Sequence, residues 1–88
     1  MHEQALIDDL VREIERVAMR AGSTRVTRIR VRLGALAHLT PEHFGEHFEL
    51  AADGTVAERA EIEIEESFDP LEPDAAEIVL TSVDVEET

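Results

Sequence analysis

Apolar residues in the first quarter of the chain recur at steps of three and four positions, which is the period of one face of an α-helix. The set comprises Leu6, Ile7, Leu10, Val11, Ile14, Val17, Ala18 and Ala21. Gly22 follows directly, and glycine is typical of the position just after a helix C-terminus. The pattern therefore predicts an amphipathic helix that buries this stripe and ends before Gly22.

Two later segments alternate between apolar and charged residues, which is the pattern of half-buried β-strands. In residues 26–33 the apolar face carries Ile29, Val31 and Leu33, and the other face carries Arg28, Arg30 and Arg32. In residues 61–65, Ile62 and Ile64 alternate with Glu61, Glu63 and Glu65. We expect the apolar faces to meet helices. The arginines and glutamates are expected to pair across neighbouring strands rather than to form an anion-binding stripe.

A second helix is predicted between these strands. Thr40 is a suitable N-cap, Pro41 fits the first helical position, and Leu39 is placed to pack on Phe44 as a hydrophobic staple. Its expected buried stripe consists of Phe44, Phe48, Ala51 and Ala52. Gly54 can take the left-handed conformation that ends the helix.

The order of these elements predicts one α/β (α+β) domain over residues 1–88. A strand–helix–strand unit prefers a right-handed crossover, so the strands at 26–33 and 61–65 should be parallel. A closing strand from Glu77 to Val85 is expected to return antiparallel to its predecessor. We therefore predict the order α-β-α-β-β, with two helices packed on one face of a three-stranded mixed sheet.

Charge is distributed unevenly within the net charge of -13. Residues 1–44 hold seven arginines and six acidic residues, whereas residues 45–88 hold one arginine and fifteen acidic residues. An acidic chain repels phosphate backbones, so no nucleic-acid partner is expected. The acidic half could attract cations or a basic partner, or could serve only solubility or a salty cytoplasm. No leader or membrane-spanning stretch is recognisable, so a cytoplasmic protein is expected, and a chain of this size could dimerise.

Candidate metal chemistry begins at the first residue. The amine of Met1, the backbone nitrogen of His2 and its ring Nδ1 can close two chelate rings around one cation. A near-planar, nitrogen-rich donor set of this kind suits Ni²⁺ or Cu²⁺.

Several segments together resemble the HypA family, accessory proteins that supply nickel to [NiFe]-hydrogenase and in some organisms to urease. The segments are Met1-His2-Glu3, Ala5-Leu6-Ile7, Leu10-Val11, residues 26–34 and residues 54–58. The resemblance implies nickel as the metal, His2 as its essential ligand, the amine of Met1 as a second ligand, and Glu3 completing or tuning the site. It also implies a HypB-type GTPase and a hydrogenase large-subunit precursor as partners.

The family's zinc ribbon, which carries two Cys-x-x-Cys pairs, has no counterpart in this chain. The sequence contains no cysteine, so a thiolate zinc site cannot form and no zinc is expected. A loop over residues 66–76 is expected in place of the ribbon.

Three further histidines are weaker candidates. His43 and His47 are four residues apart on the predicted second helix, a spacing at which two imidazoles can share one metal. Such pairs more often border the core on a solvated face, and His38 lies in the loop before the N-cap.

Enzymatic chemistry has little support in the sequence. There is no cysteine nucleophile, no glycine-rich phosphate loop, and no tyrosine or tryptophan to shape a substrate pocket. We therefore interpret the chain as a nickel-binding metallochaperone or maturation factor and not as an enzyme. Two alternatives stay open: an interaction or regulatory module on the same fold that has lost metal delivery, and a fragment of a fuller protein.

Overall fold

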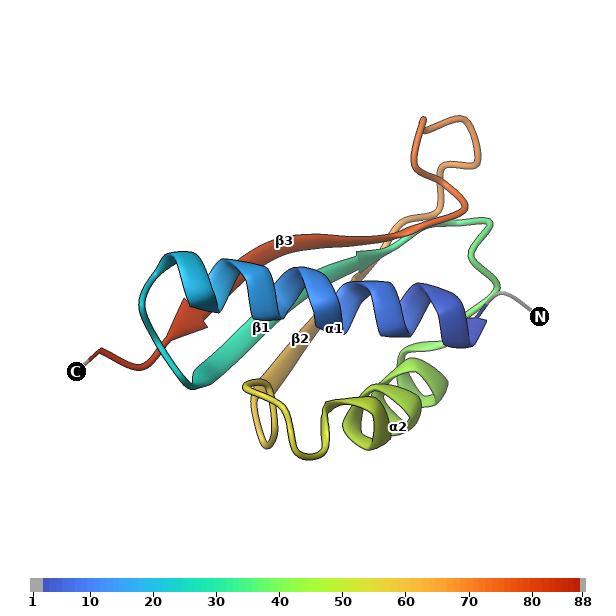
Figure 1. Cartoon of the computed structure of the whole chain (residues 1–88). Helices are drawn as coiled ribbons and strands as arrows, with labels where there is room; N and C mark the ends of the chain where they lie inside the picture. Colours follow the sequence, from blue (N-terminus) through green and yellow to red (C-terminus); the bar gives the residue numbers. More distant parts are fainter. Residues whose placement is uncertain (1–2, 88) are drawn as a thin grey trace.

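The computed structural model describes residues 3–87, which form two α-helices and three β-strands (Figure 1). The elements are α1 (Glu3–Arg20), β1 (Val26–Leu33), α2 (Pro41–Ala52), β2 (Glu61–Glu66) and β3 (Ile78–Val85). This is the predicted α-β-α-β-β order. Within the described residues, neither helix is long and apolar enough to cross a membrane.

β1 is the central strand of a three-stranded sheet with the order β2-β1-β3. It pairs with β2 in parallel, as the crossover rule predicts, and with β3 in antiparallel fashion. β3 therefore runs antiparallel to β2, as expected, but its hydrogen-bonded neighbour is β1. The central position of β1 explains why Val26, Ile29, Val31 and Leu33 are all buried.

The core lies between the sheet and the two helices, which pack on the same face of the sheet (Figure 1). Its buried members are Ile7, Leu10, Val11, Ile14, Ala18, Val26, Ile29, Val31, Leu33, Phe44, Phe48, Ala52 and Ala57. The predicted stripe of α1 is thus largely confirmed, but Ala21 is exposed. The helix ends one residue earlier, and the chain turns away through Gly22 at a φ of 69°.

α2 has the predicted caps at both ends. The Thr40 side chain accepts a hydrogen bond from the backbone N–H of His43 at 3.2 Å, and Pro41 occupies the first turn. Leu39 packs against the core. Beyond the helix, Gly54 adopts the left-handed conformation with a φ of 80°. The N-terminal cap fixes the first turn of α2 and therefore the position of His43.

The sheet face away from the helices carries the expected pairing of opposite charges, with one difference. Arg28 contacts Glu61 and Glu63, each at 3.3 Å, and Arg30 contacts Glu63 at 2.6 Å. Arg32 is in register with Glu65 but forms its ion pair with Asp74, at 2.9 Å. Asp74 belongs to the loop between β2 and β3, so the third arginine holds this loop to the sheet.

The loop over residues 67–77 lies directly against the chain segment that follows β1. The N–H of Gly34 donates to the carbonyl of Glu77 at 3.0 Å, and the N–H of Leu36 donates to the carbonyl of Ala75 at 2.7 Å. A side chain at position 34 would overlap the backbone carbonyl of Ala75. Glycine is therefore required at this position by the close approach of two backbones.

Candidate metal centre

The first turn of α1 and the N-terminal half of α2 bring three potential metal ligands together. Glu3 is the first residue of α1, and His43 and His47 lie one turn apart on α2. Phe44 and Phe48, each directly following one of these histidines, are buried in the core with their ring centroids 5.7 Å apart. Because the two phenylalanines point into the core, the preceding histidines are placed at its border, beside the first residue of α1.

The carboxylate of Glu3 lies between the two imidazoles. Its Oε2 is 2.9 Å from Nε2 of His43 and 3.1 Å from Nδ1 of His47, and its Oε1 is 3.0 Å from the same Nε2 of His43. The imidazole centroids are 4.3 Å apart. All three residues can offer a ligand atom within 4.8 Å of the others.

Oε2 of Glu3 is shielded from solvent, and no donor in residues 3–87 gives it a hydrogen bond of acceptable geometry. Both imidazole nitrogens lie within ion-pair distance of this oxygen, at 2.9 and 3.1 Å. The rings themselves remain accessible, since the side chain of His43 is 50% exposed and that of His47 is 38% exposed. The cluster is therefore a set of converging donors that is open to solvent on one side.

The predicted site residues are placed as follows. Met1 and His2 lie outside the described residues, whereas Glu3 is in the cluster. His43 and His47 are brought to Glu3, and His38 is exposed and outside the cluster. The four-residue spacing of the two histidines was visible in the sequence. Their contact with Glu3 was not, because it depends on how α1 packs on α2.

Two imidazoles and one carboxylate form a donor set that suits borderline first-row divalent ions. Glu42 and Glu46 flank the histidines on α2. This acidic environment favours a bound cation electrostatically. The arrangement can bind metal, and the residues described here show no nucleophile and base pair that would indicate catalysis.

Comparison with known proteins gives consistent matches. The family profile described as "Hydrogenase/urease nickel incorporation, metallochaperone, hypA" matches residues 1–70. A hydrogenase maturation factor HypA of Archaeoglobus fulgidus is 38% identical over 64 residues, which cover 73% of this chain and 58% of that protein. The corresponding protein of Methylocella silvestris is 40% identical over 65 residues, with 74% and 58% coverage. The chain thus spans about 58% of the length of these relatives.

The fold of this chain also matches the fold of a solved structure. The solution structure of the nickel metallochaperone HypA from Helicobacter pylori superimposes with a TM-score of 0.77 at 18% identity, covering 97% of each chain. At this identity the likeness concerns the fold alone. The family is described as one of metal incorporation and not of catalysis, in agreement with the interpretation that the chain is not an enzyme. From the match over residues 1–70, the chain belongs to the HypA family of hydrogenase and urease nickel-incorporation metallochaperones.

Proposed function

We propose that this chain binds Ni²⁺ at its N-terminus and delivers it, in the cytoplasm, to a [NiFe]-hydrogenase or a related nickel enzyme. The ligands in this proposal are His2 and the amine of Met1, with Glu3 completing or tuning the site. The observation that carries the proposal is the position of Glu3, at the start of α1 and against two imidazoles of α2. A metal held by His2 is bound one residue away from this cluster.

The shape of the domain supports delivery rather than long-term storage. Glu3 begins α1 at one end of a molecule that measures 41 × 22 × 18 Å, and the imidazoles beside it are partly exposed. A metal at this end is accessible to an acceptor without unfolding of the core.

We further propose that residues 1–88 act as a single nickel-binding domain, in which the loop after β2 stands where relatives carry a zinc ribbon. The chain has no cysteine, so its metal chemistry rests on nitrogen and oxygen donors. The short loop is held to the sheet through Asp74 and to the segment after β1 through Ala75. Partner recognition must then use the surface of this domain, and not a ribbon.

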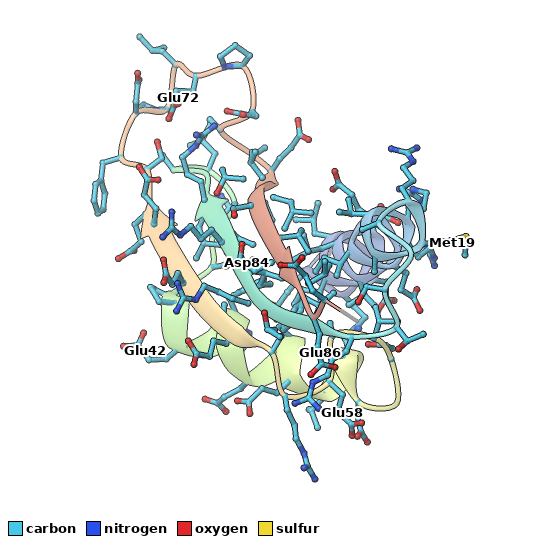
Figure 2. All side chains as sticks on the ribbon, turned by 90° about the vertical axis from the view of Figure 1, so that its left-hand side faces the viewer. Met19, Glu42, Glu58, Glu72, Asp84 and Glu86 are labelled. Carbon is cyan, nitrogen blue, oxygen red and sulfur yellow. The ribbon has the colours of Figure 1, made fainter. Side chains whose placement is uncertain are left out.

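Acidic side chains provide such a surface. Figure 2 shows Glu42 and Glu58 at the periphery of the molecule. Glu58 and Glu66, which precede and end β2, are exposed and form no ion pair with another described residue. We propose that α1 and this acidic surface, over residues 58–66, contact a HypB-type GTPase and a hydrogenase large-subunit precursor.

Partner capture tests this proposal. Immobilised protein should retain the GTPase or the precursor at low salt and lose it at high salt, because exposed charges are screened beyond about 8 Å at physiological ionic strength. Changing Glu58 and Glu66 to lysine should lower the association rate constant, measured by surface plasmon resonance, by about 10-fold.

A charge-matched control distinguishes a local effect at the docking surface from a general effect of net charge on the association rate. Asp84→Lys, compared with Glu66→Lys alone, alters net charge by the same amount on β3, at the opposite edge of the sheet. It should change the association rate much less. If neither partner is captured while nickel binding is intact, the chain is a passive nickel buffer. If both partner and nickel binding fail, the interpretation as a regulatory module replaces metal delivery.

A further inference from the structure

We propose that Glu3, His43 and His47 form a second binding site for a divalent first-row transition metal, distinct from the N-terminal chelate. The site uses Oε2 of Glu3, Nε2 of His43 and Nδ1 of His47. It shares Glu3 with the proposed N-terminal site but requires neither the amine of Met1 nor the imidazole of His2. The inference therefore goes beyond the proposed function and can hold or fail independently of it.

Distances support this assignment. Nitrogen and oxygen ligands lie about 2.1 Å from such a metal, so two ligands at right angles are separated by about 3.0 Å. Oε2 of Glu3 is 2.9 Å from one imidazole nitrogen and 3.1 Å from the other. The largest separation within the set does not exceed 4.8 Å. Small rotations of the two imidazoles are enough to place all three donors around one ion.

The environment of Glu3 gives an independent reason. A carboxylate oxygen shielded from solvent and without a hydrogen bond is costly, because its hydration is lost without replacement. Oε2 is in this condition among residues 3–87, while its neighbours are the potential ligand atoms of two imidazoles. A cation bound by all three residues would compensate this oxygen directly.

The donor set indicates the kind of metal. Two imidazoles and a carboxylate occupy one side of the ion and leave positions for water, since both histidine side chains are at least 38% exposed. Without a planar set of four nitrogens, Ni²⁺ in this site should be six-coordinate, high-spin and paramagnetic. Ni²⁺ in the N-terminal chelate should instead be planar and diamagnetic.

The competing interpretation is that Glu3 only forms ion pairs with protonated imidazoles and thereby clamps α1 to α2. Both interpretations predict that the cluster stabilises the start of α1. Only the metal site predicts that Ni²⁺ binds when the N-terminal chelate has been removed.

The test uses a protein in which two residues precede Met1 and His2 is changed to alanine, so that neither the free amine nor the second imidazole is available. Ni²⁺ is titrated by calorimetry and by NMR of the histidine ring protons. We expect one Ni²⁺ per chain and paramagnetic broadening of the His43 and His47 ring signals, with His38 unaffected.

Variants of the blocked protein identify the ligands. His43→Gln combined with His47→Gln, and separately Glu3→Gln, should lower the Ni²⁺ affinity by at least about 10- to 100-fold, the loss seen when even an outer-shell partner of a metal is removed. His38→Asn is the matched control, because His38 is exposed at a φ of 59° and asparagine tolerates this conformation. It should leave the affinity unchanged.

Thermal unfolding followed by circular dichroism checks that each variant is folded. The proposal is overturned if the blocked protein binds no Ni²⁺, or if it binds Ni²⁺ without broadening the rings of His43 and His47. It is also overturned if folded variants lacking both imidazoles bind as tightly as the blocked parent. If the planar Ni²⁺ species is absent but the paramagnetic Ni²⁺ species is present, the proposed N-terminal chelate is wrong and the site at Glu3, His43 and His47 stands.

Discussion

Replacing His2 with alanine should eliminate the planar, diamagnetic Ni²⁺ species and lower the affinity of the N-terminal site by at least about 100-fold, or about 2.7 kcal/mol. The reason is geometric, because the six-membered chelate ring needs the imidazole of His2. Without it, only the five-membered ring between the terminal amine and the backbone nitrogen can form. The measurement is calorimetric titration with Ni²⁺, combined with the absorption spectrum of planar Ni²⁺, which distinguishes this site from the cluster at His43 and His47.

Adding two residues before Met1 should have the same effect while leaving every original side chain in place, because the terminal amine becomes an amide. His38→Asn serves as the control for general loss of a histidine and should retain the planar species. Equal nickel affinity in the parent protein and in His2→Ala would exclude the proposed chelate, and so would an affinity that is unchanged by the added residues.

Gly34→Ala should destabilise the fold by about 1–3 kcal/mol, the usual cost of forcing additional atoms into a packed region. A Cβ at this position would overlap the carbonyl of Ala75 and approach the carbonyl of Asp74 to 2.8 Å. These are backbone atoms, which cannot move aside as the end of a flexible side chain can. Relief requires displacement of the loop and weakens the hydrogen bond from Leu36 to Ala75. Urea unfolding followed by circular dichroism measures the change.

Gly45→Ala is the matched substitution with the opposite expected sign. Gly45 lies inside α2, and a Cβ there would have no atom within 4 Å outside the helix's own backbone. Alanine should therefore stabilise the protein by about 1 kcal/mol through helix propensity alone. If Gly34→Ala leaves the free energy of unfolding unchanged, the close approach of the loop to the segment after β1 is not a constraint in solution.

Elements and buried faces were predictable because they depend on local patterns. A few neighbouring residues are enough to specify such a pattern. Examples are the staple and cap residues before α2 and the alternation of buried and exposed residues in β1. The parallel pairing of β1 with β2 followed from the general handedness of such crossovers. The family was recognisable from short segments within residues 1–58, and the family profile matches residues 1–70.

Contacts between distant residues were not predictable in the same way. Arg32 had a suitable partner in Glu65 by register, yet it pairs with Asp74, because the loop after β2 folds back over the end of β1. Whether β3 would lie beside β1 or β2 depends on the packing of all three strands. The contact of Glu3 with His43 and His47 likewise requires the relative position of two helices that are separated by a strand.

The two ends of the described chain lie at opposite ends of α1, which makes the C-terminal end a convenient point of attachment (Figure 1). The hydroxyl of Ser23, just after α1, donates to the carbonyl of Glu86 at 2.9 Å. α1 has 18 residues and is therefore about 27 Å long, so a dye or a surface linker placed after Glu86 is separated from Glu3 by roughly that length. Protein immobilised in this way presents its metal-binding end uniformly to the solution, without a tag on the amine that the chelate requires.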